Sequence, residues 1–326
     1  MRGLPTCFID ESREMNFEPL WWAVARSEEV TGAKPLNVDL GDQPIVLWRD
    51  AESTPRALED RCPHRRAPLS LGCILGNGMI QCGYHGWTYD GATGHLKDIP
   101  NLKGERKFPP LYRAIPFAVC ESGGFVRVCA DPKAALPTQQ GDMLPLSGTA
   151  QLSLPHAEFL NALYDDPSLV LSIRGVRFTP YLATELIEAN GRLVMERNCQ
   201  WAGPRWPAPF IPEFPAALHI STEPETGESE LVLRDADFNE LLRVVLAPVP
   251  GGRGVTQIRW RAKLAARRPG LMAKFIGAGT PFAILPAVDA AALRVLRPSA
   301  SVHAEALRQE SIHRRTGAVS QRPGGE

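Results

Sequence analysis

Short runs of apolar and β-branched residues, separated by turn residues, occupy the first 130 positions of the chain. The runs at residues 45–48, 56–59, 79–82, 87–89 and 125–129 have the length and composition of strands. Gly76-Asn-Gly78 and Asp90-Gly91 are signals for hairpin turns. The first half of the chain is therefore predicted to be all-β.

The second half begins with a connecting stretch. Residues 132–155 contain few large apolar side chains and several turn formers, so we expect one domain over residues 1–140 and another over 141–326. The predicted fold class is α+β, with an all-β first domain followed by an antiparallel sheet that has helices against one face. The supporting segments are strand-like runs at 192–197, 231–233, 240–246 and 254–263 and a helical, alanine- and leucine-rich stretch at 289–315, interrupted at Pro298.

The composition narrows the choice of partners. Thirty-six basic and 36 acidic residues cancel, which gives no electrostatic basis for binding nucleic acid and favours a small or neutral substrate. The apolar stretches are far shorter than the ~20 residues that a membrane span requires. The opening segment lacks the continuous apolar core of a signal peptide, so we expect a cytoplasmic protein without a membrane partner.

The cysteines suggest metal ligation. Seven cysteines have neither the even count nor the density of a disulfide scaffold, and two of them stand beside histidines. These two lie in Arg61-Cys-Pro-His-Arg-Arg-Ala-Pro-Leu-Ser-Leu-Gly72 and Ile80-Gln-Cys-Gly-Tyr-His-Gly-Trp87. Two Cys/His pairs on facing loops can hold two sulfide-bridged irons, with both histidines on one iron and both cysteines on the other. The candidate ligands are Cys62, His64, Cys82 and His85.

A structural zinc site is the main alternative, because zinc also takes two cysteines and two histidines. Zinc sites of this type usually have two cysteines in one short segment and two histidines in the other, as C-x₂₋₄-C followed by H-x₃₋₅-H. Here each loop mixes one cysteine with one histidine, as C-x-H and C-x-x-H. The spacing therefore favours the iron–sulfur cluster over zinc.

At these residues the chain resembles the Rieske non-haem iron oxygenase α subunits, and in particular their demethylase-type monooxygenases of methoxylated aromatics. The likeness continues in Ala57-Leu-Glu-Asp60, His85-Gly-Trp87 and Gly123-Gly-Phe-Val-Arg-Val128. It is strong to about residue 130 and weak beyond. The resemblance implies a Rieske [2Fe-2S] domain, a helix-grip-type second domain, a reductase or ferredoxin as electron donor, and a head-to-tail trimer. Two residues depart from the family: Arg66 stands where glycine is common, and Gly83 where proline is common.

The second metal centre of that family is incomplete in this sequence. Family members hold a mononuclear iron with two histidines of a D-x-x-H-x-x-x-x-H helix and a distant aspartate. With Asp166 as the first aspartate, Leu169 and Arg174 occupy the histidine positions, and starting from Asp165 supplies no histidine either. Leucine has no lone pair and arginine carries only donors, so we expect no usual Fe(II) site. Asp289 aligns with the family's carboxylate ligand, as a vestigial ligand or as an acid near a helix start.

The role of Asp166 stays open at this point. In the family, the matching aspartate joins the cluster of one subunit to the iron of its neighbour, so Asp166 is a candidate relay between subunits. Equally, Asp165 and Asp166 fit turn or helix-start residues before Pro167. A metal site rebuilt from the remaining histidines is a less favoured possibility; these are His95, His156, His219, His303 and His313.

Three functions follow from these features. The first is a cluster-bearing oxidoreductase component that passes electrons to a mononuclear iron in a homologous partner subunit. The second is a self-sufficient terminal oxygenase with atypical iron ligands, acting as a hydroxylase or as an O- or N-demethylase on a small aromatic or heterocyclic molecule. The third is a stand-alone Rieske electron carrier. We rank them in this order, because the cluster ligands are present and the histidines of the second centre are missing.

Overall fold

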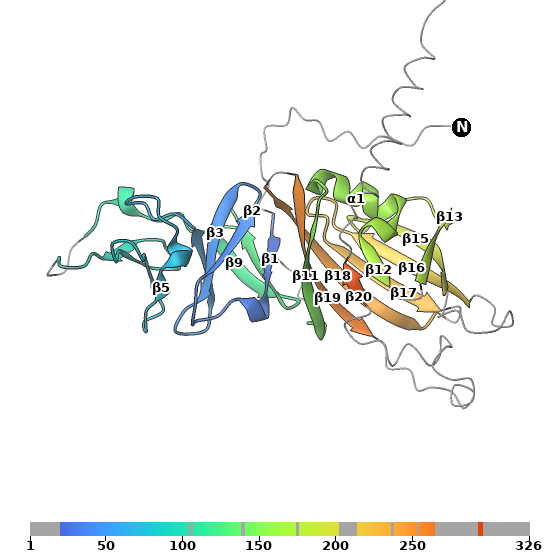
Figure 1. The fold of residues 1–326 in the computed structure, drawn as a ribbon, viewed down its shortest axis with the longest axis horizontal. Coiled ribbons are helices and arrows are strands. Elements are labelled where there is room, and N and C mark those ends of the chain that lie inside the picture. Colours follow the sequence, from blue (N-terminus) through green and yellow to red (C-terminus); the bar gives the residue numbers. More distant parts are fainter. Residues whose placement is uncertain are drawn as a thin grey trace, which may run out of the picture.

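The computed structural model describes residues 20–102, 104, 107–137, 141–173, 176–201, 214–235, 238–252, 254–264 and 293–295. This part of the chain is mostly β and elongated, with small sheets at one end and one large sheet at the other (Figure 1). The all-β first half and the antiparallel sheet of the second half are confirmed. No helix within the described ranges has the length and apolar character to cross a bilayer.

Two three-stranded antiparallel sheets form the middle of the molecule. One has the order β1-β10-β9 and the other the order β2-β3-β4. Alternate residues of these strands, such as Val24, Ile45 and Leu47, are fully buried in a shared core. The strands are β1 (Trp22–Arg26), β2 (Leu36–Leu40), β3 (Gln43–Arg49), β4 (Pro55–Glu59), β9 (Ala118–Ser122) and β10 (Phe125–Cys129).

A four-stranded sheet of very short strands lies at the end of the molecule away from the large sheet (Figure 1). Its hairpins leave most of their residues in loops, and these loops contain the four candidate ligands. A separate core that includes Trp48, Leu69 and Tyr89 supports them. The strands are β5 (Cys73–Ile74), β6 (Ile80–Gln81), β7 (Thr88–Tyr89) and β8 (Leu96–Asp98), and the short helices η2 (Leu69–Leu71) and η3 (Pro110–Tyr112) flank them.

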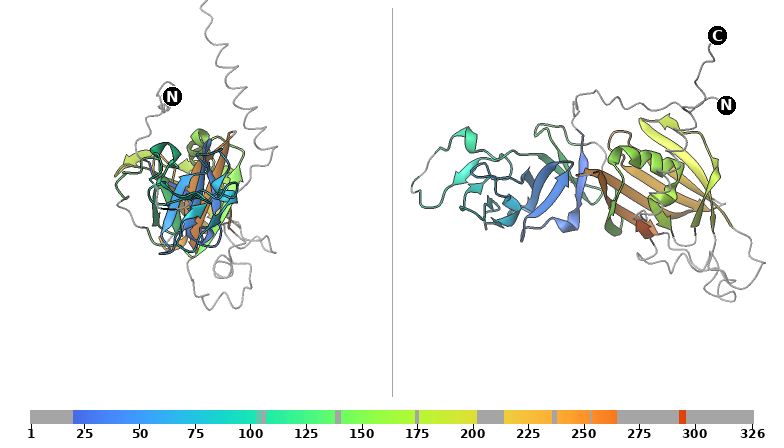
Figure 2. Two further views of the ribbon diagram at one scale, coloured as in Figure 1. Left: turned by 90° about the vertical axis from the view of Figure 1, so that its left-hand side faces the viewer. Right: turned by 45° about the horizontal axis from the view of Figure 1, so that its top comes forward.

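The large sheet has eight antiparallel strands in the order β11-β19-β18-β17-β16-β15-β13, with β14 paired to β15. Helix α1 (His156–Asp165) lies across one face of it (Figures 1 and 2) and buries Phe159 and Leu163 against the sheet. The strands are β11 (Leu146–Leu152), β13 (Val176–Ala183), β14 (Ile187–Ala189), β15 (Arg192–Trp201), β16 (Phe214–Thr222), β17 (Ser229–Asp235), β18 (Glu240–Gly251) and β19 (Val255–Leu264). The expected boundary at residue 140 falls between β10 and β11.

The predicted C-terminal helix is wrong where the structure describes it. Residues 293–295 form strand β20 (Leu293–Val295), which pairs with β12 (Leu171–Ile173). Alanine and leucine favour a helix intrinsically, but the tertiary pairing with β12 decides the conformation of these three residues. The remainder of that stretch lies outside the described residues.

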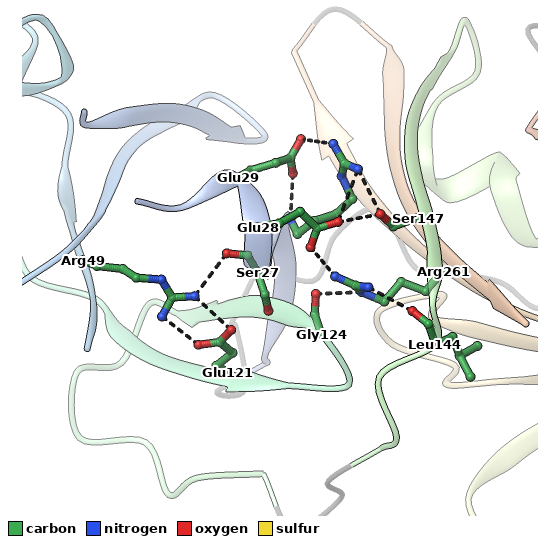
Figure 3. Close-up of polar contacts among 10 residues, drawn as sticks. Ser27, Glu28, Glu29, Arg49, Glu121, Gly124, Leu144, Ser147 and Arg261 are labelled. Carbon is green, nitrogen blue, oxygen red and sulfur yellow. Dashed lines mark hydrogen bonds and ion pairs between the residues drawn. The ribbon is translucent and has the colours of Figure 1, made fainter. Parts of the chain in front are cut away.

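A network of arginines and glutamates joins the middle sheets to the large sheet (Figure 3). Arg261 of β19 is 3% exposed; it donates to the carbonyl oxygens of Gly124 (2.8 Å) and Leu144 (3.0 Å) and pairs with Glu28 of η1 (Ser27–Glu29). Arg26 donates to Ser147 of β11 at 3.1 Å. Buried charges of this kind hold both sheets in one geometry only if each is paired, and here Arg261 has a partner on either side of the junction.

Candidate metal centre

The four candidate ligands come from two loops with the same backbone hydrogen bonds. In the first loop, Cys62 N–H donates to the Ala67 carbonyl (2.8 Å) and Arg66 N–H donates to the Cys62 carbonyl (2.8 Å). In the second, Cys82 N–H donates to the Trp87 carbonyl (2.8 Å) and Gly86 N–H donates to the Cys82 carbonyl (3.0 Å). Each cysteine therefore opens a turn that is closed four and five residues later.

The fourth residue after each cysteine has a left-handed backbone. Arg66 has φ 59° and Gly86 has φ 72°. Glycine adopts this conformation without steric cost, whereas a side chain costs about 1 kcal/mol or more. The departure of Arg66 from the family therefore adds local strain, which is partly offset by a contact from its Nη2 to Glu59 Oε1 at 3.1 Å.

A pair of variants tests this account of Arg66. We expect Arg66→Gly to be more stable than Arg66→Ala by about 1 kcal/mol, because both lose the contact with Glu59 and only glycine removes the strain. Urea unfolding of the two proteins, loaded with the same metal, gives the difference in the free energy of unfolding. Equal stabilities would contradict a strained backbone at residue 66.

Gly83 is explained by the close approach of the two loops. A Cβ atom at Gly83 would lie 2.7 Å from the carbonyl oxygen of Leu71, and one at Gly72 would lie 1.9 Å from that of Gln81. Both distances are below any ordinary contact, so a larger residue would push the first loop away from the second. Glycine in place of the family's proline therefore keeps the loops together in this chain.

The two cysteine side chains are buried between the loops. Cys62 and Cys82 are each 2% exposed. Burial raises the pKa of the Cys62 thiol, and so does the adjacent Cys82, while hydrogen bonds from Tyr89 and from the backbone of His64 act in the opposite direction. The Tyr89 hydroxyl lies 3.1 Å from Cys62 Sγ. Burial raises the pKa of this phenol far above its usual value, so Tyr89 keeps its proton and can donate to a thiolate.

The two imidazoles lie on the outer side of the cysteines. The rings of His64 and His85 have centroids 4.7 Å apart, and His64 stacks on Trp87 at 4.3 Å with parallel planes. Trp87 in turn meets the edge of Tyr112 at 5.2 Å. Desolvation, together with the charges of His85 and Arg65, lowers the pKa of His64, which favours the neutral, metal-binding imidazole.

One nitrogen atom in the loops is placed as a metal ligand would be. The Nδ1 atom of His64 is buried and has no hydrogen-bond partner among the described residues. Buried polar atoms are nearly always paired, so an unpaired imidazole nitrogen beside two buried thiols fits a group that binds metal. The residues present therefore fit a cluster held by two thiolates and two imidazoles.

Two buried carboxylates brace the base of the first loop. Asp60 accepts hydrogen bonds from the Ser70 N–H (2.7 Å) and from the Asn37 side chain (2.8 Å). Glu59 lies 3.1 Å from Arg66 and 3.7 Å from Arg61. These contacts fix the ends of the loop to strands β2 and β4, which lowers the entropy cost of holding the ligands in place.

The segment that corresponds to the family's mononuclear iron site begins where helix α1 ends, and its described residues form a short helix and then strand β12. Asp165 is the last residue of α1 and Asp166 caps its C-terminus, with its N–H bonded to the Ala162 carbonyl at 3.1 Å. Asp166 also precedes a second helical turn, because its carbonyl accepts from the Leu169 N–H at 3.0 Å, so the two residues lie at the end of one helix and the start of the next. Leu169 closes the short helix η4 (Pro167–Leu169) and packs against the core of the large sheet. Arg174 and Asp289 lie outside the described residues.

The other described histidines lie away from the two loops' cysteines, and their contacts are hydrogen bonds, ring contacts or solvent. His156 Nε2 lies 3.0 Å from the Thr226 carbonyl, and its ring meets the edge of Trp22 at 5.2 Å. His219 lies 3.3 Å from Glu196 on the large sheet, and His95 is exposed. Among the described residues, no group of three or more His, Cys, Asp and Glu side chains is arranged to hold a single metal ion. His303 and His313 lie outside these residues.

Comparison with known sequences identifies the first part of the chain. A family model described as the Rieske [2Fe-2S] domain matches residues 20–109. The chloroplast protein TIC 55 of Arabidopsis thaliana is 33% identical over 168 residues, which is 49% of this chain and 31% of the relative. The oxygenase component of dicamba O-demethylase from Stenotrophomonas maltophilia is 39% identical over 124 residues, 38% of this chain and 35% of the relative. The chain thus spans about a third of the length of these curated relatives.

Solved structures extend the likeness of fold to the second half. Dicamba monooxygenase bound to dicamba superposes with a TM-score of 0.60 at 21% identity, covering 94% of this chain and 91% of that one. NdmB of Pseudomonas putida CBB5 superposes with a TM-score of 0.55 at 19% identity, covering 78% and 77%.

The loops and the family match together define an iron–sulfur protein with a Rieske [2Fe-2S] domain. Its relatives and structural neighbours include the oxygenase component of a demethylase and a monooxygenase, in agreement with the resemblance seen in the sequence. Tyr89 was missed by sequence reasoning. Its place two residues after Trp87 carries no local signal, because its contact with Cys62 joins positions 27 residues apart.

Proposed function

We propose that Cys62, His64, Cys82 and His85 hold a Rieske [2Fe-2S] cluster, and that the chain passes electrons from a reductase or ferredoxin to a mononuclear iron in a homologous partner subunit. The observation that carries the proposal is the pair of matching loops with buried thiols inside, imidazoles outside and the unpartnered Nδ1 of His64. When bound, such a cluster supplies a one-electron acceptor with a potential of roughly −150 to +300 mV.

The position of the loops favours transfer between chains. The four-stranded sheet with the loops and the large sheet with α1 lie at opposite ends of the molecule, separated by the middle sheets and their own core (Figure 2). The exposed ring of His85 is therefore accessible to a neighbouring molecule, whereas Leu169 of the same chain lies at the far end of the molecule. In a head-to-tail ring, Asp166 of one chain would lie at the receiving side of this contact.

The missing histidines favour a partner subunit as the site of oxygen chemistry. The chain has no histidine between His156 and His219, so the segment 166–174 offers no imidazole for a mononuclear iron. Leu169 adds apolar packing in place of a ligand. We propose on this ground that the second domain shapes the contact between subunits, while a homologous chain with intact ligands binds the small aromatic or heterocyclic substrate.

Metal analysis separates this proposal from its alternatives. We expect about two irons and two sulfides per chain after anaerobic purification. Zinc without sulfide would overturn the cluster, and a third, mononuclear iron with oxygen-dependent turnover by the chain and a reductase alone would favour the self-sufficient oxygenase. Co-expression with a homologous chain that retains D-x-x-H-x-x-x-x-H should yield a mixed oligomer with oxygen-dependent turnover.

The hydrogen bond from Tyr89 gives a prediction on potential. The Tyr89 hydroxyl donates to the Cys62 sulfur, and this hydrogen bond should stabilise the more negative, reduced cluster by about 1–2 kcal/mol. Tyr89→Phe removes the hydrogen bond, so the reduction potential should fall by roughly 40–90 mV. A redox titration followed by visible absorbance measures the shift. Tyr112→Phe is the matched control, because the Tyr112 ring contacts Trp87 and not a ligand. A fall of equal size in the control would show that the effect is not due to the sulfur.

A further inference from the structure

A cavity of about 690 Å³ lies where the middle sheets meet the large sheet, and we call it the junction cavity. Its walls come from the residues before β1, from β10, from the connection before β11, and from β15, β18, β19 and the β16–β17 hairpin. Its lining includes Trp21, Leu144, Val245, Asp142, Glu223 and Glu225. A cavity of this volume between two packed units is a common place for a small ligand.

The junction cavity lies on the face of the large sheet that α1 does not cover. Side chains alternate between the two faces of a strand. Val244 and Leu246 of β18 belong to the core beneath α1. Val245, between them, packs against the cluster that contains Phe125 of β10. The cavity is therefore separate from Leu169, which packs against the core beneath α1.

The arginines at the cavity are already occupied by the protein. Arg127 of β10 donates from both terminal nitrogens to the carboxylate of Glu228. Arg192 of β15 donates to the carbonyl oxygens of Ser221 (3.0 Å) and Glu228 (3.2 Å). Arg261 bonds two carbonyl oxygens and a glutamate at the junction of the sheets. An anionic ligand would have to compete with these acceptors for each guanidinium group.

The carboxylates at the cavity are the polar groups with capacity to spare. Asp142 and Glu225 are exposed, and neither has a hydrogen bond or an ion pair to its side chain within the described part of the chain. Glu223 has one contact, to Arg192 Nη1 at 3.7 Å. Burial raises the pKa of Glu223 against the charge of Arg192, and the charges of Glu225 and Glu228 add to the rise. Negative charge at this part of the lining is therefore in excess, and a cation would neutralise it.

Apolar side chains complete the lining. Trp21 is partly exposed, and its indole N–H donates to the Ala135 carbonyl at 3.1 Å, which fixes the ring. Leu144 and Val245 extend this apolar surface into the cavity. Two arginines already lie over the ring of Phe125, whereas no cation among the described residues lies over the ring of Trp21. Tryptophan is the aromatic side chain that attracts cations most strongly, so its ring favours the same sign of ligand as the carboxylates.

We propose that the junction cavity binds a small organic cation, whose amine or quaternary ammonium group pairs with Glu223 and Glu225 and whose apolar or aromatic body packs on Trp21. The inference goes beyond the proposed function, because the cavity shares no residue with the candidate cluster or with the segment at Leu169. A bound ligand would contact both the middle sheets and the large sheet, and it would therefore stabilise their junction.

The test uses the full chain and three indole compounds that differ mainly in charge: tryptamine as the cation, tryptophol as the neutral compound and indole-3-propionate as the anion. Isothermal titration calorimetry measures their affinities. We expect tryptamine to bind about tenfold or more tightly than tryptophol, and the anion to bind more weakly than either. Raising the salt from ~20 mM to ~300 mM should weaken the binding of tryptamine and leave that of tryptophol unchanged.

Three variants separate the contributions of charge and ring. Glu223→Gln and Glu225→Gln should each weaken tryptamine binding about threefold to fivefold, with little effect on tryptophol. Trp21→Leu should weaken both compounds, because both lose the aromatic surface. Since the Glu225 side chain is exposed, its substitution tests the cavity even if the Trp21 variant does not fold.

Glu188→Gln is the matched control, because Glu188 is an exposed carboxylate on β14, the short strand paired to β15. It should leave the affinity for tryptamine unchanged. Equal affinities for the three indoles, an unchanged affinity in both cavity glutamate variants, or an equal loss in Glu188→Gln would overturn the inference. Iron and sulfide counts on the same samples report on the cluster separately, so the failure of one proposal is distinguishable from the failure of the other.

Discussion

Cys82→Ala should remove the iron and sulfide from the chain almost completely, from about two irons to fewer than ~0.2. Cys82 supplies one of two thiolates, and the remaining thiol and two imidazoles cannot hold both irons of a bridged pair. The loss should be visible as disappearance of the visible absorbance and in direct metal analysis. Because Cys82 is 2% exposed inside the core of the small sheet, its loss should also destabilise the two loops.

Cys73→Ala provides the control for this variant. Cys73 belongs to the same small sheet, opposite Gln81 across strands β5 and β6, but its side chain is exposed. The Cys73 variant should keep the full iron and sulfide content. Retention of two irons by Cys82→Ala, or an equal loss in Cys73→Ala, would contradict the assignment of the ligands.

Arg261→Ala should lower the free energy of unfolding by about 3–5 kcal/mol. The buried guanidinium donates to the carbonyl oxygens of Gly124 and Leu144 and pairs with Glu28 (Figure 3). It also lies 5.6 Å from the centre of the Phe125 ring. Removing it breaks two charge-assisted hydrogen bonds to backbone carbonyls, each worth about 1.5–3 kcal/mol, and takes one charge partner from Glu28, which keeps Ser147 and Arg26. Urea unfolding measures the change.

The comparison for Arg261 is Arg234, whose side chain is 35% exposed. Arg234→Ala should cost less than about 1 kcal/mol, because an exposed pair is screened by solvent. A similar cost for both arginines would show that the junction contributes no special stability.

The same junction gives a pH dependence. Burial raises the pKa of Glu28, but the hydrogen bond from Ser147 and the charges of Arg261 and Arg26 outweigh burial and lower this pKa from 4.5. The contribution of Glu28 is therefore complete above about pH 5 and is lost as the pH falls through its lowered pKa.

The ligand set could be predicted from the sequence because it depends on local spacing. C-x-H and C-x-x-H put one sulfur and one imidazole on each loop, whatever the sheets around them do. The strand at 125–129 was predicted with the bounds that the structure shows, since its apolar run is short and bounded by turn residues. The run at 79–82 was predicted two residues too long, because the turn of the second loop begins at Cys82.

Other features depend on contacts between distant residues. Helix α1 was not predicted, although Phe159 and Leu163 are spaced four residues apart on one face. The residues that follow it, Asp165 to Pro167, have the composition of a turn. The strand at 293–295 follows from pairing with β12 and not from its helical composition. The roles of Tyr89 and of the buried Arg261 lie in single contacts, across 27 residues for Tyr89 and 233 for the pair with Glu28.

By itself, the order of residues indicated the type of cofactor and the four residues predicted to hold it, and it fixed the absence of histidine between His156 and His219. These are properties of side-chain chemistry and short spacing, which need no knowledge of the fold. Only the tertiary structure decided that the two loops share one backbone pattern, that His64 Nδ1 has no hydrogen-bond partner within the described part of the chain, and that exposed basic and apolar side chains lie near the histidines. The physical reason is that pairing, burial and exposure are set by packing between segments far apart in the chain, which no local pattern encodes.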